Sequence, residues 1–172
     1  MTMLGCARLG LAQDQYRGLP YPPNEIFEAM LGYAEEDGFP GLTASLRYIQ
    51  PLTAALHREF KLDPEAGIRA ALAEKNAEKA RLAVLGLIFL DLRLNLRTAG
   101  EAEEAAKRAE SVQMAFLDFE LLSPAIKAKN RVLDRTAHED FRRMYAAKDR
   151  MSVQTLAEKL LGRLAPAIEG RN

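Results

Sequence analysis

Apolar residues recur in steps of four and three along most of this chain, which is the pattern of helices that each bury one stripe. The longest stripe begins after Asp63-Pro64-Glu65 and ends at Gly100. Its members are Ala66, Ala70, Ala73, Ala77, Ala80, Val84, Leu87, Asp91 and Leu94. Aspartate at an N-cap, proline in a first turn and glycine after a last turn are typical helix boundaries. The pattern predicts one long helix over about residues 64–98.

A second stripe follows over about residues 101–122, and its small residues come first. Its members are Ala102, Ala105, Ala109, Val112, Phe116 and Phe119. An antiparallel hairpin turning at Thr98-Ala99-Gly100 would match the two stripes by size. Leu87 and Leu94 would meet the alanines of the second stripe, and the two phenylalanines would meet Ala73, Ala77 and Ala80 of the first. Large against small fills a core without voids, so we expect this hairpin at the centre of the fold.

Shorter helices are expected on both sides of the hairpin. Asn24 can cap a helix that ends before Gly38, and Pro51 should kink a helix over about residues 41–60. Ser123-Pro124 fits either a helix start or a kink, and helices are expected over about residues 130–148 and 152–164. Alternating strand patterns are absent from the sequence. The prediction is an all-α antiparallel bundle of about five to six helices, with residues 24–168 as a single domain.

Residues 1–23 are expected to lie outside this domain. An apolar leader, Met3 to Ala12, has small residues where a signal peptidase would cut, but it lacks a basic stretch and a full apolar core. It fits a signal remnant or a docking terminus, which leaves both periplasm and cytoplasm open. The arm after it contains Gly18 and three prolines, and is expected to be extended, with Tyr16 and Tyr21 available to pin it to the bundle.

Composition excludes several classes of partner. Lys plus Arg equals Asp plus Glu, 24 each, so no global field attracts nucleic acid or anionic lipid. The most apolar run, Leu82 to Leu90, is less than half of the roughly 20 residues that a membrane span needs. The single cysteine, Cys6, excludes an internal disulfide and a cysteine-based metal site. A lipid anchor at Cys6 is disfavoured by the incomplete leader.

Asp91 is the one carboxylate in the long stripe. A buried carboxylate is costly unless it is paired. The hairpin would place Asp91 near Lys107 and Arg108, so an ion pair that fixes the register is expected. The alternative is a polar pocket that binds a ligand or a partner.

The residues of that alternative pocket are Asp91, Asn95, Arg93 and Arg97. Asp91 and Asn95 share one side of the helix, whereas Arg93 and Arg97 share nearly the opposite side. One pocket is therefore not expected to collect all four. The two arginines, a turn apart, suit a carboxylate or phosphate clamp, or a face toward solvent or another subunit.

Cofactor chemistry has little support in the sequence. Neither His57 nor His138 belongs to a Glu-x-x-His element, which di-iron bundles need. No Cys-x-x-Cys-His motif for covalent haem is present. His57 with Glu59, near Pro51, is the remaining candidate for a metal or a non-covalent haem. No cofactor is indicated by a motif.

Two functions remain open from the sequence. The first is a non-enzymatic helical-bundle interaction module, an accessory or structural subunit that binds a protein partner or a second copy of itself. The second is a small-molecule, haem or metal-binding bundle, with its site between Pro51 and the Asp91 region. No candidate nucleophile has an identifiable base, so no enzymatic function is predicted.

Overall fold

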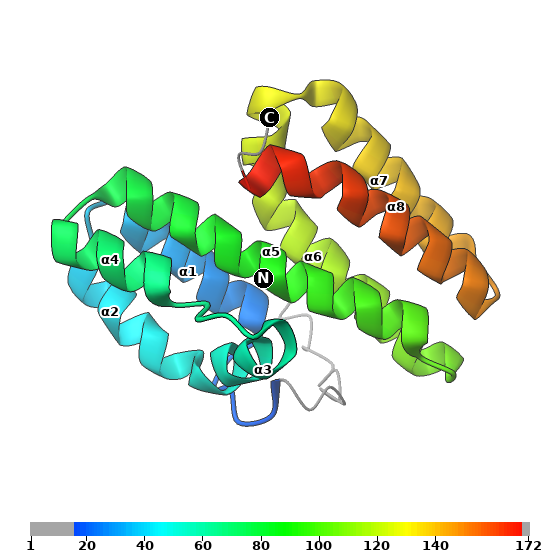
Figure 1. The fold of residues 1–172 in the computed structure, drawn as a ribbon, viewed down its shortest axis with the longest axis horizontal. Helices are drawn as coiled ribbons and strands as arrows, with labels where there is room; N and C mark the ends of the chain where they lie inside the picture. The colour runs from blue at the N-terminus through cyan, green and yellow to red at the C-terminus, as the bar shows by residue number, and fades with distance from the viewer. Residues whose placement is uncertain (1–15, 170–172) are drawn as a thin grey trace, which may run out of the picture.

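The computed structural model describes residues 16–169, which form eight helices and no strand (Figure 1). The helices are α1 (Pro23–Glu35), α2 (Phe39–Tyr48), α3 (Gln50–Phe60), α4 (Ala66–Glu74), α5 (Ala77–Glu101), α6 (Ala105–Lys129), α7 (Arg131–Ala146) and α8 (Arg150–Glu169). The all-α fold class is therefore confirmed, although two of the predicted helices are each divided in two, which makes the helices more numerous than expected.

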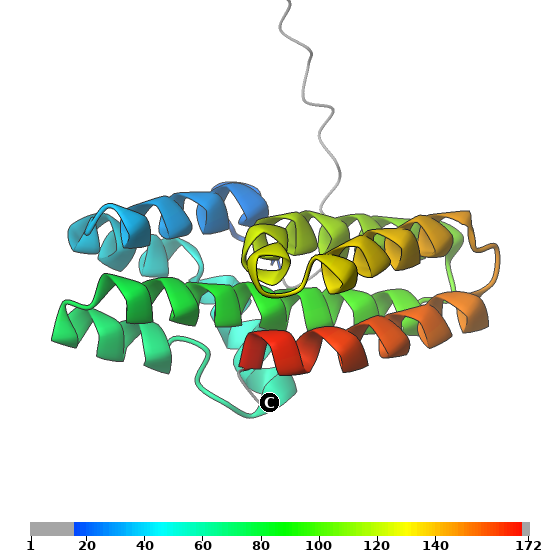
Figure 2. The same ribbon diagram turned by 90° about the horizontal axis from the view of Figure 1, so that it is seen from above.

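The four C-terminal helices form an up-down bundle. α5 packs most extensively on α6 and then on α8, while α7 closes the square between α6 and α8. Of the four N-terminal helices, α1 and α4 pack on α5 most extensively, α2 packs on α1, and the end of α3 contacts the second half of α5. Figure 2 shows α1, α6 and α7 in one layer and α5 with α8 in the other. α5 is thus the shared element of both halves.

The α5–α6 hairpin is confirmed, but its turn comes later than predicted. α5 continues through Gly100 to Glu101, and α6 begins at Ala105. Gly100 lies inside the contact with α8, where an added Cβ would be 3.3 Å from Gln154. This glycine allows two helices to approach closely and does not end a helix.

The predicted long helix is two helices. Lys75 adopts a left-handed φ of 50° and ends α4. Asn76 then caps α5, since its side-chain oxygen accepts a hydrogen bond of 2.9 Å from the Lys79 amide. Neither glycine nor proline marks this break, so the heptad spacing continues across it.

The size-matched pairing of the two stripes is wrong. Asn95 donates a hydrogen bond of 2.9 Å to Asp118, which fixes the register of α5 on α6. Ala77 lies about 27 Å along α5 from Asn95 at 1.5 Å per residue, out of reach of Phe119. Phe119 instead packs on α7, with ring centroids 5.3 Å from Phe141 and 4.9 Å from His138.

Pro51 and Pro166 have positions that differ from the predicted ones, and Pro124 does not start a helix, which was one of its two expected alternatives. Pro51 lies in the first turn of α3 and separates α2 from α3, where a single kinked helix was expected. Pro124 lies inside α6, and Pro166 lies inside α8, beyond the expected end of that helix. The first helix begins at Pro23 with Pro22 as its N-cap, and Asn24 therefore does not cap it.

Part of the N-terminal prediction can be compared with the structure. The leader and Cys6 fall outside the described residues. Tyr16 is 1% exposed and pinned to the core, whereas Tyr21 is exposed and its ring lies edge-on to Tyr48 with centroids 6.4 Å apart. Among the described helices, none is long and apolar enough to cross a membrane.

Candidate functional site

α5 separates the four candidate residues into two pairs. Asp91 and Asn95 point inward and are fully buried, whereas Arg93 and Arg97 lie on the other side and are partly exposed. No single pocket collects the four, as their spacing indicates. Each pair belongs to its own site.

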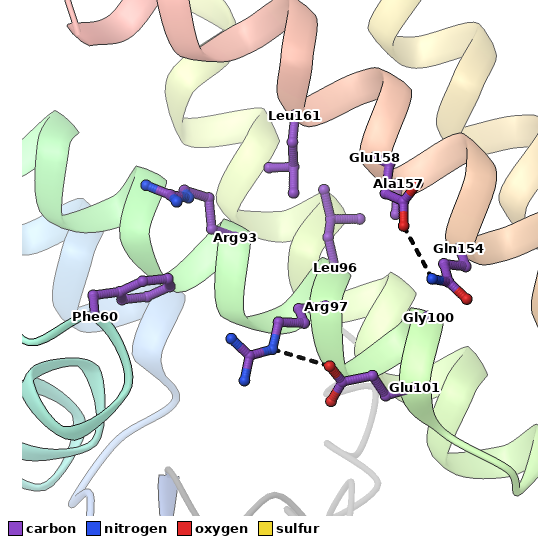
Figure 3. A pocket seen from close by; sticks show the side chains of 10 residues that line it. All are labelled: Phe60, Arg93, Leu96, Arg97, Gly100, Glu101, Gln154, Ala157, Glu158 and Leu161. Atoms are coloured by element: carbon purple, nitrogen blue, oxygen red, sulfur yellow. Dashed lines mark hydrogen bonds and ion pairs between the residues drawn. The ribbon is translucent and has the colours of Figure 1, made fainter.

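The outward site is a cavity of about 290 Å³ between α3, α5 and α8. Figure 3 shows Phe60 from the end of α3 on one side and the α8 side chains on the other, with α5 as the floor. The lining residues are Phe60, Arg93, Leu96, Arg97, Gly100, Glu101, Gln154, Ala157, Glu158 and Leu161. An apolar floor with charged side chains at its rim is the usual composition of a binding pocket.

Both arginines of this cavity are held in place. The Arg97 Nε donates to Glu101 over 3.1 Å, and its Nη1 pairs with Glu59. The Arg93 guanidinium lies 4.9 Å from the centroid of the Phe60 ring and 6.0 Å from that of Phe89. Cation–π contact and ion pairing restrict the rotamers of these side chains, which lowers the entropy cost of binding something there.

The inward site is a hydrogen-bonded cluster within the core. The Tyr16 hydroxyl lies 3.0 and 3.2 Å from the two carboxylate oxygens of Asp91 and 2.9 Å from the Asn95 Oδ1. The Asn95 Nδ2 donates to the Tyr16 oxygen over 2.6 Å and to Asp118 Oδ2 over 2.9 Å. All four side chains are at most 1% exposed.

Burial changes the acidity of both carboxyl groups. It raises the pKa of Asp91 to about 7, against the opposing effect of the Tyr16 hydrogen bond. It also raises the pKa of Asp118 well above the usual range, and the charge of Asp91 adds to the rise. Near neutral pH the pair therefore retains a proton.

The expected ion pair of Asp91 with Lys107 or Arg108 is wrong. Arg108 Nη1 donates instead to the carbonyl oxygens of Ala102 and Glu103, at 2.9 and 3.2 Å, beside the α5–α6 turn. Because the turn lies at residues 102–104, the part of α6 opposite Asp91 is the part that carries Asp118.

The structure does not bring the candidate metal ligands together. His57 Nδ1 lies 2.6 Å from the carbonyl oxygen of Leu62 just beyond α3, and Glu59 pairs with Arg97. Over residues 16–169, no group of three His, Cys, Asp or Glu side chains is arranged to hold a metal ion. A metal at His57 and Glu59 stays a prediction.

Sequence reasoning missed Asp118, Phe60 and the α8 wall of the cavity. Asp118 had a detectable signal, since it follows Ser111 by seven residues, and both lie on the buried side of α6. Phe60 and the α8 residues had none, because their place beside Arg93 depends on how distant helices pack.

Comparison with protein-family models, with curated proteins and with solved structures found no match to this chain. The chemistry of the two sites on α5 is therefore the basis for a functional assignment.

Proposed function

We propose that this chain is a non-enzymatic helical-bundle interaction module, an accessory or structural subunit that contacts a protein partner through the cavity between α3, α5 and α8. The observation that carries the proposal is the pair Arg93 and Arg97, held at the rim of an apolar cavity beside Phe60. Arginine and aromatic residues are enriched in protein interfaces, and hot spots cluster where such residues are well packed.

The cavity offers guanidinium donors and apolar surface to a partner segment that carries a carboxylate next to an aliphatic group, with Glu101 and Glu158 in the lining balancing the charge of the two arginines. A guanidinium has five N–H donors. Among residues 16–169, the ion pairs of Arg97 with Glu101 and Glu59 engage Nε and Nη1 and leave donors on Nη2 for an incoming carboxylate. Leu96, Ala157 and Leu161 provide apolar contact beside it.

The size of the cavity supports a side chain as the occupant. At about 290 Å³ it lies just below the roughly 300–1,000 Å³ of pockets that enclose drug-sized ligands. A cavity of this volume also fits a second candidate function, which is the binding of a small carboxylate metabolite. The two candidates use the same arginines and differ in what co-purifies with the protein.

The test is affinity purification from the native source with chemical cross-linking, using wild type and Arg97→Glu. The matched control is Arg69→Glu on α4, because Arg69 is also 50% exposed and paired with two acids, Asp63 and Glu65. We expect a partner that cross-links at the cavity, loses at least about thirtyfold in affinity with Arg97→Glu, and is kept by the control.

A partner retained by Arg97→Glu, or cross-linked only elsewhere, would contradict the proposal. A stoichiometric small carboxylate in native mass spectra of the wild-type protein, absent from Arg97→Glu, would favour the second candidate.

A further inference from the structure

The segment that precedes α1 has one fully buried side chain, with partial core contact from Leu19 and an edge-on ring contact between Tyr21 and Tyr48. Tyr16 is buried, Leu19 is half-buried, and the remaining residues of 17–22 are exposed or nearly so. The Leu19 amide donates to the Tyr16 carbonyl oxygen over 3.1 Å, so the buried tyrosine is followed at once by a turn. Residues 16–22, here called the strap, can therefore lift from the bundle if the contacts of Tyr16 are lost.

Tyr16 contacts Asp91 directly and Asp118 through Asn95. The cluster has fewer hydrogen-bond donors than acceptor oxygens. The Tyr16 hydroxyl carries one hydrogen and faces three acceptors, the two oxygens of Asp91 and the Oδ1 of Asn95. The Asn95 amide supplies two more hydrogens, to Tyr16 and to Asp118. The buried Oδ1 of Asp118 receives no hydrogen bond within the described part of the chain.

No cation within residues 16–169 neutralises either acid. Neither Asp91 nor Asp118 takes part in a salt bridge among these residues. Of the elements around them, the strap contributes Tyr16 and α6 contributes Asp118. No charged side chain of α1, α3, α4 or α8 acts on their titration. Two ionised carboxylates in one dry cluster repel each other and lose hydration, so the closed cluster favours binding a proton.

We propose that the Tyr16 cluster is a proton-controlled latch: the strap lies closed on α5 while the Asp91–Asp118 pair is protonated, and lifts increasingly as the pair loses protons. Lifting the Tyr16 ring admits water to both carboxylates and lowers the cost of ionising them. Closure therefore favours protonation and protonation favours closure, because linkage acts in both directions.

The linkage fixes how opening depends on pH. The closed state binds more protons than the open one, so the open fraction rises with pH, by up to about tenfold per pH unit for one proton. Burial raises the pKa of Asp91 to about 7, so the increase in the open fraction that is due to Asp91 ends near neutral pH. In the double variant Asp91→Asn/Asp118→Asn the side chains have nearly the same shape, so we expect the cluster to form, and it has no carboxyl to bind such a proton.

Tryptic cleavage after Arg17, followed by mass spectrometry of the full chain, measures opening of the strap. The cleavage rate of wild type divided by that of the double variant at the same pH removes the pH dependence of the protease. We expect this ratio to rise at least about tenfold between about pH 5 and about pH 7.5. Cleavage after Lys75, between α4 and α5, is the internal control and should keep a constant ratio.

Three results would overturn the latch. One is a ratio for Arg17 that does not change with pH. Another is an equal change at Lys75, which would indicate opening of the whole bundle. The third result comes from the wild type alone and therefore holds even if the double variant fails to fold. It is the absence of a protonated-carboxyl band from infrared spectra between about pH 5.5 and about pH 6.5, well above the ordinary aspartate pKa. Presence of that band, together with the rising ratio, supports the latch.

Discussion

Replacing Asp91 with asparagine gives a stability change whose size follows from the buried cluster. Burial raises the pKa of Asp91 from 3.8 to about 7. The folded protein therefore binds more protons than the unfolded chain between these values, and stability falls as pH rises through this window. A shift of about 3 units at 1.36 kcal/mol per unit amounts to about 4 kcal/mol, all of it lost by about pH 8.

The substituted asparagine keeps the shape of the side chain and an oxygen that accepts from Tyr16, but it carries no charge. We expect Asp91→Asn to be more stable than wild type by up to about 4 kcal/mol at about pH 8, and nearly equal to it at about pH 4. Urea unfolding followed by far-UV circular dichroism at several pH values measures both free energies. The control with the opposite sign is Asp149→Asn, at an exposed position where hydrogen bonds from Ser152 lower the pKa of the carboxyl, so that wild type should gain relative to this variant as pH rises.

Equal destabilisation by Asp91→Asn at both pH values would refute this reasoning, because it would mean that the difference in stability does not depend on the ionisation of Asp91. A stability of the wild type relative to Asp91→Asn that rises from about pH 4 to about pH 7 would do the same, since it would require a lowered pKa of Asp91.

Three further changes test the packing. Ala115→Leu, at a fully buried position on α6, should cost about 1–3 kcal/mol in urea unfolding, whereas Ala105→Leu on the exposed side should change stability by less than about 0.5 kcal/mol; equal effects would contradict the observed register. Lys75→Gly should raise the thermal midpoint, because glycine relieves about 1 kcal/mol of left-handed strain at the α4–α5 break. Arg163→Met should lower the free energy of unfolding by roughly 3 kcal/mol, since it removes the 2.5 Å partner of buried Asp140; an unchanged value would show that Arg143, 3.6 Å from Asp140, is enough.

Hydrophobic periodicity identified the helices and the central hairpin, because both depend on local spacing. It also separated Asp91 and Asn95 from Arg93 and Arg97, since residues two apart on a helix point to different sides. The break at Lys75 could not be found in this way. Residues on both sides of it are helix formers, and the left-handed residue there is a lysine.

The partners of the site residues depended on the position of one turn. In an antiparallel hairpin, moving the turn by about four residues moves the residue opposite a given position by about eight. The expected turn at 98–100 therefore placed Asp91 opposite Lys107 and Arg108, while the observed one brings Asp118 into the cluster. Tyr16 and Phe60 reach α5 through tertiary packing, about which periodicity carries no information.

The separation of Tyr16 from Asp91 by 75 residues also has a kinetic consequence. The Asn95–Asp118 contact spans 23 residues and can form early with the α5–α6 hairpin, whereas the strap must close a much longer loop. Asp91 is then still hydrated when the folding barrier is crossed, and its desolvation comes afterwards. Raising the pH should therefore speed unfolding and leave the folding rate almost unchanged.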